Sequence, residues 1–191
     1  MKGLRSGCHA AAMTAERPPD AAGMHIAVDV CYLSSGRARA ALVAATDRRL
    51  SSIAWSRTAV TAVTEPYQPG EFWRRELPPL LAVLDGIAAP ALIVIDGYVD
   101  LDPAGRPGLG ARIHTELGAP VIGVAKTFFR GAVHAVPICR GGSARPLFVT
   151  AAGIGVADAA GMVEQMAGSH RIPDALRLAD RLSRGLEPPV A

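Results

Sequence analysis

The stretch Ala91-Leu92-Ile93-Val94-Ile95-Asp96-Gly97 decides which fold this chain can form. Its apolar part is rich in β-branched residues and is about as long as one strand, which is typical of a strand buried on both faces of a sheet. The acid at its end has two interpretations. Asp-Gly is a common turn after a strand, but an isolated carboxylate is costly to bury, and at the edge of a sheet it could bind a metal ion.

A second strand of the same kind, at residues 121–125, ends directly before Lys126. A short helix is predicted between the two strands, at residues 111–117. Strand, helix and strand with this spacing predict a βαβ unit, in which the two strands run parallel. Because ligands of open α/β sheets bind beyond the carboxyl ends of parallel strands, Asp96 and Lys126 are expected at the same edge of the sheet.

The part of the chain before this unit predicts three antiparallel strands and a helix. Turn signals such as Ser34-Ser35-Gly36 separate successive apolar runs, and connections this short join antiparallel neighbours. The first strand carries an acid, Asp29. The helix carries Glu76, and a kink or a restart is expected at Pro78-Pro79. The predicted strands cover residues 25–32, 38–46 and 50–63, and the helix covers residues 71–87.

Two further strands and two helices are expected after the βαβ unit, at residues 133–139, 146–150, 156–167 and 173–183. The predicted fold class is therefore α/β, with a mixed sheet that combines an antiparallel meander and a parallel βαβ unit and is flanked by helices. The hydrophobic content of 50% and the length of 191 residues fit one domain, at residues 24–185. Residues 1–23 are expected to form a flexible leader, and residues 186–191 a C-terminal tail.

The composition excludes several classes of protein. Charged residues make up 19% of the chain, too few for a disordered protein of this hydrophobicity, and no apolar run is long enough to span a bilayer. Three widely spaced cysteines without a CxxC pattern indicate a reduced, cytoplasmic setting. The net charge of +3 permits a polyanionic partner without requiring one.

Lysine is rare in this chain: of the twenty basic residues only Lys2 and Lys126 are lysines. Since arginine serves almost everywhere else, Lys126 is expected at a place where arginine cannot act. A compact ammonium group beside a phosphate or a carboxylate is such a place. An ordinary loop charge is the plainer alternative.

Six short motifs in a fixed order show that the chain resembles the endonuclease V family. They extend over residues 24–185, which is nearly the whole chain, and a single motif of this kind would be a weak signal. The motifs are Val28-Asp29-Val30; Pro66-Tyr67-Gln68-Pro69-Gly70 followed by Phe72, Arg75-Glu76 and Pro78; Ile95-Asp96-Gly97; Gly123-Val124-Ala125-Lys126; Arg145-Pro146-Leu147-Phe148-Val149; and Arg171-Ile172-Pro173.

The resemblance implies a ribonuclease-H-like fold, in which the first and fourth strands lie side by side and each offers an acid to one site. It implies a metal-dependent endonuclease of DNA repair that cuts near deoxyinosine or other deaminated or mispaired bases, or near inosine in RNA. Asp29, Asp96 and Glu76 would bind Mg²⁺, for which Mn²⁺ can substitute, and Lys126 would complete the catalytic set. Carboxylate oxygens suit these ions. We expect a monomer that acts on nucleic acid and not at a membrane.

The resemblance also assigns residues that contact the nucleic acid. Tyr67, the prolines on either side of it (Pro66 and Pro69) and Gly70 would form a wedge beside an everted base. As an arginine predicted to be exposed, Arg75 is expected to contact a phosphate of the strand. Extruding a base is costly, least so for a mispaired one, and a rigid aromatic loop can fill the gap. A packed loop anchor is the alternative for Tyr67, and a solvated surface charge is the alternative for Arg75.

Two interpretations are open for Asp158, which is either an acid favoured in the first turn of a helix or a further metal ligand. Several histidines of the family are absent. Tyr98 and Val99 follow the central Asp-Gly, the following loop lacks His-Pro-Arg, and Gly153-Ile154 stand where Gly-His is usual. These departures leave two alternatives open: a non-catalytic nucleic-acid-binding protein of the same fold, and a nuclease with another target.

Overall fold

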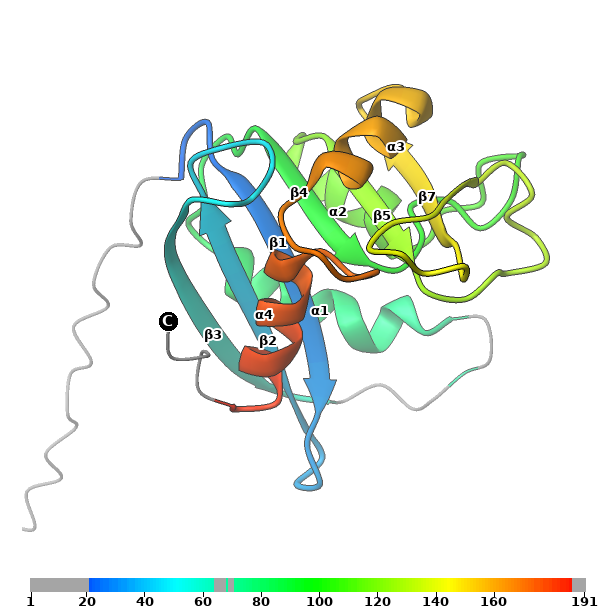
Figure 1. Ribbon diagram of the computed structural model, residues 1–191. Helices are drawn as coiled ribbons and strands as arrows, with labels where there is room; N and C mark the ends of the chain where they lie inside the picture. Colours follow the sequence, from blue (N-terminus) through cyan, green and yellow to red (C-terminus); the bar gives the residue numbers. More distant parts are fainter. Residues whose placement is uncertain (1–20, 64–67, 69–70, 187–191) are drawn as a thin grey trace, which may run out of the picture.

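A seven-stranded mixed sheet lies at the centre of the computed structural model, which describes residues 21–63, 68 and 71–186 (Figure 1). The strand order in the sheet is β3-β2-β1-β4-β5-β7-β6. The strands are β1 (His25–Tyr32), β2 (Arg37–Ala45), β3 (Ile53–Ala62), β4 (Leu92–Asp96), β5 (Val121–Ala125), β6 (Val136–Ile138) and β7 (Leu147–Ala152). The helices are α1 (Trp73–Leu84), α2 (Leu109–Leu117), α3 (Val156–Gln165) and α4 (Asp174–Ser183).

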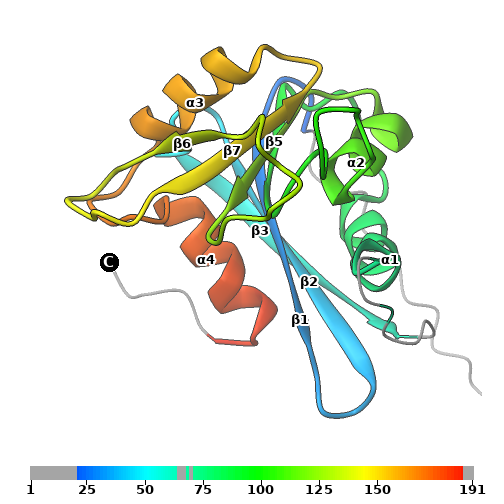
Figure 2. The same ribbon diagram turned by 90° about the vertical axis from the view of Figure 1, so that its right-hand side faces the viewer.

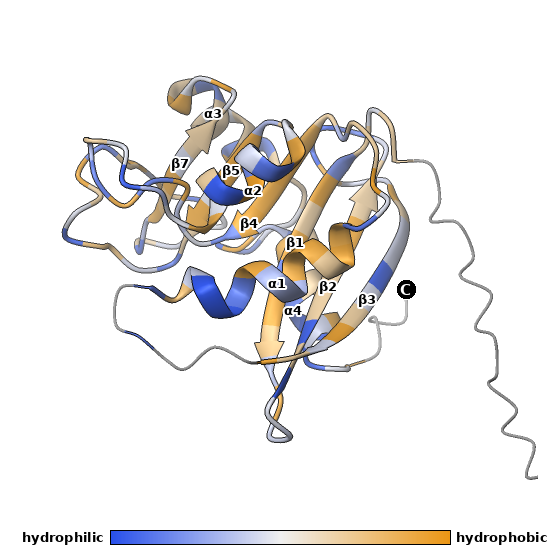
Figure 3. Ribbon diagram, turned by 180° about the vertical axis from the view of Figure 1, so that it is seen from behind, coloured by the Kyte–Doolittle hydropathy of each residue, from blue (hydrophilic) through white to orange (hydrophobic). Residues whose placement is uncertain are grey.

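Different pairs of helices cover the two faces of the sheet, α1 and α2 on one face and α3 and α4 on the other (Figure 2). The side chains of the strands alternate accordingly. Ile26 and Val28 of β1 pack with residues of α1 and α2, whereas Ala27 packs with residues of α3 and α4. In β4, Ile95 likewise packs with residues of α1 and α2, and Val94 packs with residues of α3 and α4. Because both faces are buried, the central strands are apolar along their length, as β4 and β5 show in Figure 3.

The pairing of β1 with β4 determines where the acids of the sheet lie. β1 runs antiparallel to β2 and parallel to β4, and β4 runs parallel to β5. Val28 lies opposite Ile95, so the next residue on each strand, Asp29 and Asp96, comes at the same end of the pair. The meander, the parallel βαβ unit and the flanking helices confirm the fold class predicted from the sequence.

Helix α1 passes through two prolines as a single element. The sequence predicted a kink or a restart at Pro78-Pro79, and the restart is wrong, because the helix is continuous from Trp73 to Leu84. The two prolines remove two backbone donors and so weaken the helix. Pro79 and Leu80 are buried, and this burial of apolar surface offsets the lost hydrogen bonds.

The packed part of the chain begins before Met24. Ala21 is 1% exposed, and the amide of Gly23 donates to the carbonyl of Ala89 at 3.1 Å. Residues 21–23 therefore pack on the domain, although their composition suggested part of the leader. Among the helices that the structure describes, none has the length and apolar character needed to cross a membrane.

The turn after β4 folds back closely over β5 at Gly123. Gly97 begins this turn with a φ of 145°, and the amide of Val99 then donates to Thr150 Oγ1 at 2.8 Å. A Cβ atom at Gly123 would lie 2.6 Å from the carbonyl oxygen of Gly97 and 2.8 Å from Thr150 Oγ1. A glycine at position 123 therefore lets the turn that follows Asp96 close over the sheet.

We expect Gly123→Ala to lower the free energy of unfolding by about 1–3 kcal/mol, because the turn has to shift to admit the methyl group. Gly161→Ala in α3 is the matched control, since a Cβ there meets nothing within 4 Å. Alanine in that helix should raise the free energy of unfolding by about 0.5–1 kcal/mol. Urea unfolding followed by circular dichroism measures both changes, and equal stabilities of the two variants would contradict the close approach at Gly123.

Candidate active site

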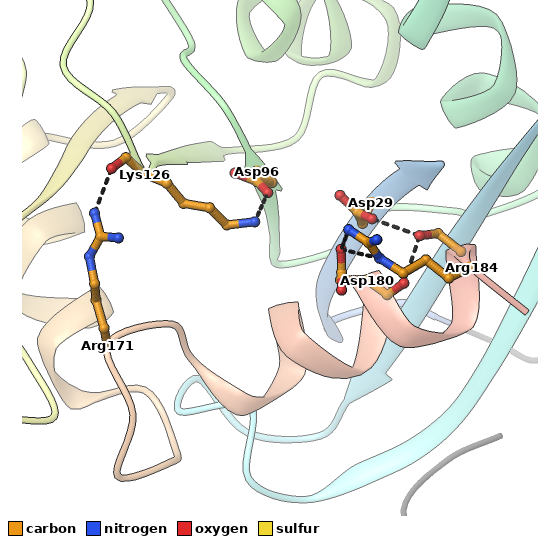
Figure 4. Close-up of polar contacts among 7 residues, drawn as sticks. Asp29, Asp96, Lys126, Arg171, Asp180 and Arg184 are labelled. Carbon is orange, nitrogen blue, oxygen red and sulfur yellow. Dashed lines mark hydrogen bonds and ion pairs between the residues drawn. The ribbon is translucent and has the colours of Figure 1, made fainter. Parts of the chain in front are cut away.

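Asp29 and Asp96 lie on neighbouring strands, just beyond the residues at which β1 and β4 pair. Each acid lies two residues after a residue that packs toward α3 and α4, which is Ala27 in β1 and Val94 in β4. Their carboxyl groups therefore project on the side of the sheet where α4 lies (Figure 4). The turn interpretation of Asp-Gly also holds, because Gly97 leaves the strand at once. Asp96 therefore ends a strand and faces the site.

Ser183 of α4 holds the carboxylate of Asp29. Its Oγ donates to Asp29 Oδ2 at 2.7 Å, and Ser183 is fully buried. Burial raises the pKa of Asp29 to about 6; the hydrogen bond from Ser183 opposes this shift, whereas the charges of Asp96 and Asp180 add to it. Asp29 is thus a carboxyl group that titrates close to neutral pH.

Helix α1 brings Glu76 to the same place from the other face of the sheet. Burial, with a further contribution from the charges of Asp29 and Asp96, raises the pKa of Glu76 to about 8 against the opposing charge of Arg75. At neutral pH, and without a metal ion among the acids, Glu76 therefore keeps its proton. A cation placed among these carboxyl groups would favour the ionised form.

Lys126 forms an ion pair with Asp96, from Nζ to Oδ2 (Figure 4). The two side chains come from the ends of adjacent parallel strands, as the sequence predicted for this edge of the sheet. Burial acts to lower the pKa of Lys126, but the hydrogen bond and the charge of Asp96 outweigh it, so the pKa lies above its ordinary value. The ammonium group therefore stays charged, and with 43% of its side chain exposed it can reach a ligand.

One pocket of about 500 Å³ unites these groups. Four carboxyl groups and one ammonium line it, and most of its remaining wall is aromatic or aliphatic. Phe72 and Phe129 on that wall are 46% and 39% exposed. The polar lining consists of Asp29, Glu76, Asp96, Asp180, Lys126 and Arg184, and the apolar wall includes Phe72, Trp73, Tyr98, Leu101, Leu109 and Phe129. The pocket offers charge on one side and flat rings on the other.

The fourth acid, Asp180, is a site residue that the sequence analysis missed. It lies on α4 and lines the pocket, with Oδ1 accepting from Arg184 Nη2 at 2.8 Å. A signal was present in the sequence. Asp180 follows Leu176 by four residues and precedes Ser183 by three, so these residues share one face of the helix. Leu176 and Ser183 are buried, and an acid on such a face needs an explanation.

The donor set suits a hard divalent cation. Carboxylate oxygens are the ligands that Mg²⁺ and Mn²⁺ prefer. The pKa values of Asp29 and Glu76 are raised by burial above all and then by the neighbouring carboxylates, whose negative charge a cation would offset. As the side chains stand, the described part of the chain has no group of three or more His, Cys, Asp or Glu residues arranged to hold a metal ion. Asp29, Asp96 and Asp180 are each engaged by a protein donor instead.

Asp158 does not line this pocket, so the structure does not bring it together with the other acids expected to bind the metal. It is in the first turn of α3 and lines a separate hollow with Arg48 and Arg49. The reason is topological. β7 runs antiparallel to β5, so α3, which follows β7, begins at the edge of the sheet opposite the end of β5 and Lys126. The interpretation as a first-turn acid is confirmed.

The residues assigned to nucleic-acid binding are only partly described. Tyr67, Pro69 and Gly70 lie outside the described residues. Arg75 is described, and its guanidinium lies over the ring of Tyr32 at 4.5 Å from the centroid. Arg75 therefore packs on the β1–β2 hairpin beside the pocket, and its predicted contact with a strand of nucleic acid stays a prediction.

Tyr98, which directly follows Gly97, lines the pocket. Its hydroxyl donates to the carbonyl of Thr127 at 2.8 Å and accepts from the amide of Phe129 at 3.0 Å. The phenol therefore fixes the loop that follows Lys126. Its role in this chain is to shape the wall of the pocket, which places Phe129 beside the acids.

Comparison with known proteins identifies the family to which this chain is similar. The sequence profile of the Endonuclease V family matches residues 10–157. Endonuclease V of Streptomyces coelicolor is 30% identical over 190 residues, which cover 87% of this chain and 80% of that protein. The crystal structure of endonuclease V from Streptomyces avermitilis superposes with a TM-score of 0.72 at 30% identity, covering 88% of this chain and 82% of the other.

A more distant structure has the same fold. Endonuclease V of Ciona intestinalis, crystallised with a 23-mer DNA that contains an inosine followed by a ribo-adenosine, gives a TM-score of 0.71 at 18% identity. The match covers 85% of this chain and 84% of that one. With the family profile and the Streptomyces relatives, these findings show that the chain belongs to the endonuclease V family.

Proposed function

We propose that this protein is a metal-dependent endonuclease that hydrolyses a phosphodiester bond near deoxyinosine or another deaminated or mispaired base. Membership of the endonuclease V family supports nuclease activity, and the Ciona relative was crystallised with inosine-containing DNA. The observation that carries the proposal is the pocket in which four carboxyl groups and Lys126 meet at one edge of the sheet.

The acids of the pocket are the residues that would hold the metal ion. We assign Mg²⁺, with Mn²⁺ as a substitute, to Asp29, Asp96 and Glu76, and we add Asp180 because it lines the same pocket. When bound, the ion supplies activation of a water molecule and stabilisation of the leaving oxygen. Asp29 and Glu76 have to lose their protons to act as ligands, so the raised pKa values make metal binding stronger as the pH rises.

Lys126 has the charge and the freedom to act on the substrate. Its ammonium is held beside the acids by Asp96, and it would neutralise charge that develops on the scissile phosphate. Asp96 therefore has two roles in the proposal. It offers an oxygen to the metal, and it orients the ammonium before substrate arrives.

The apolar wall of the pocket suits the base of the substrate. Phe72 and Phe129 expose aromatic surface beside the acids, and bases stack on such rings without regard to sequence. Tyr67, with Pro69 and Gly70, would fill the gap that an everted base leaves in the strand. DNA and inosine-containing RNA both fit this description, and we expect the protein to act as a monomer in the cytoplasm.

A non-catalytic nucleic-acid-binding protein is the second candidate. The observation that favours it is Tyr98, which stands at a histidine position of the family and hydrogen-bonds to the protein's own loop. In that case the acids would still gather in the pocket, but the strand would be bound without being cut.

The test of the endonuclease is nicking of strands that contain a single inosine, in the presence of Mg²⁺. Wild type should cut them, and Asp96→Ala should reduce the rate about a hundredfold or more, since it removes both a metal ligand and the partner of Lys126. Asp180→Asn should also reduce it strongly, whereas Asp158→Asn, at the opposite edge of the sheet, should retain wild-type activity. Failure of wild type to cut inosine DNA or RNA under any metal condition would refute the proposal.

The second candidate makes a different prediction about binding. If the protein only binds nucleic acid, its affinity should fall steeply with salt, as phosphate contacts require, and should be the same with Mg²⁺ and with EDTA. For the endonuclease we expect EDTA to weaken binding to inosine DNA, because four carboxyl groups without a cation repel phosphate. Fluorescence anisotropy with labelled DNA at several salt concentrations separates the two.

The raised pKa of Glu76 makes the stability of the metal-free protein depend on pH. Because the pKa of about 8 exceeds the ordinary value of 4.5, the native state retains a proton that the unfolded chain has lost, and native stability falls as the pH rises through this window. Glu76→Gln removes this loss, so in EDTA it should be more stable than wild type at pH 9 by more than about 1 kcal/mol. Near pH 5 the two should be alike, and Mg²⁺ should reverse the order at pH 9. A constant difference across pH in urea unfolding would contradict the assignment.

A further inference from the structure

Arg171 lies in the connection between α3 and α4 and binds two backbone carbonyls at the edge of the sheet. Its Nη2 donates to the carbonyl of Lys126 at 2.5 Å and to the carbonyl of Pro146 at 2.7 Å. Lys126 directly follows β5 and Pro146 directly precedes β7, and these strands pair antiparallel. One guanidinium therefore joins the ends of two neighbouring strands to the segment that leads into α4.

The connection that carries Arg171 is itself fixed. Arg140, which is only 8% exposed, donates to five backbone carbonyls between residues 166 and 171, at 2.5–3.5 Å. Gly141 packs so closely on this segment that a Cβ there would lie 2.3 Å from the carbonyl carbon of His170. Arg171 thus acts from a rigid support.

Lys126 needs such a contact because the sheet does not hold it. The last residue of β5 that pairs with β7 is Ala125, opposite Phe148, so the backbone of Lys126 lies beyond the ladder. Its long side chain has to leave that backbone at the right angle to meet Asp96. In Figure 4, Arg171 binds the main chain of Lys126 on one side, and Asp96 binds the ammonium on the other.

We propose that Arg171 is a positioning residue for the reaction: by binding the carbonyl of Lys126 it aims the Lys126 ammonium at Asp96 and the incoming phosphate. The inference deepens the proposed endonuclease and rests on it for the consequence to catalysis. The competing role is a structural brace that merely anchors the connection between α3 and α4. The two roles differ in what happens at the ammonium of Lys126.

The rarity of lysine in this chain provides a direct readout. Lys126 and Lys2 are its two lysines, so brief reductive methylation, read by peptide mass spectrometry, reports on Lys126 with Lys2 as internal reference. In Arg171→Met the ratio of Lys126 to Lys2 labelling should rise about two- to fivefold, the factor that corresponds to the loss of an exposed ion pair. Arg171→Lys replaces the planar guanidinium by a single ammonium group and should give an intermediate labelling ratio.

Arg145→Ala is the matched control for the labelling experiment. It removes a positive charge from the residue adjacent to Pro146, but no hydrogen bond joins the Arg145 side chain to Lys126 among the described residues. Its labelling ratio should equal that of wild type. An unchanged ratio in a folded Arg171→Met or Arg171→Lys variant, checked by circular dichroism, would overturn the proposal.

A catalytic measurement complements the labelling. On inosine DNA with Mg²⁺, Arg171→Met should lower kcat about tenfold or more, as misplacement of a catalytic group does, while Kd for the same strand changes little. In a Lys126→Ala background the same substitution should have no further effect, because its target is gone. A loss of equal size in both backgrounds would identify a brace. If wild type does not cut at all, the proposed function fails, and the labelling ratio still decides the role of Arg171.

Discussion

The candidate site depends on the parallel pairing of β1 with β4. This pairing sets Val28 opposite Ile95 and therefore brings Asp29 and Asp96, which are far apart in sequence, to neighbouring positions. A register shift of one residue would turn either acid to the other face of the sheet. The apolar residues on both faces of these strands hold the register, since they pack against helices on each side. The packing of the core thus also fixes where the two acids lie.

Gathering four carboxyl groups in one pocket is electrostatically unfavourable, and the structure shows how the chain tolerates it. Three of the acids each have a partner within the protein: Ser183 holds Asp29, Lys126 holds Asp96, and Arg184 holds Asp180. Glu76 instead keeps a proton, through its raised pKa. The site is therefore stable without a metal ion but has stored repulsion, which a divalent cation would relieve. At many functional sites the folded protein is less stable than it could be, because the site is arranged for its function.

The sequence predicted much of this arrangement because the relevant signals are local. An apolar run that ends in Asp96, a lone Lys126 after a second run, and short turns between strands define the sheet and two of its site residues. Asp180 was missed because the spacing of Leu176, Asp180 and Ser183 places it on one helix face but does not say where α4 packs. Asp158 was ambiguous for a similar reason, since the direction of β7 decides at which edge of the sheet α3 begins. Long-range packing therefore determines what sequence patterns leave open.

The bond from Ser183 to Asp29 joins the last helix to the first strand, across 154 positions of the chain. A ribosome delivers β1 early and α4 only after every other element of the domain has been made. Until α4 docks, Asp29 lacks its hydrogen-bond donor and Asp180 is missing from the pocket. A growing polypeptide of this sequence would accordingly have an incomplete pocket until α4 has been made.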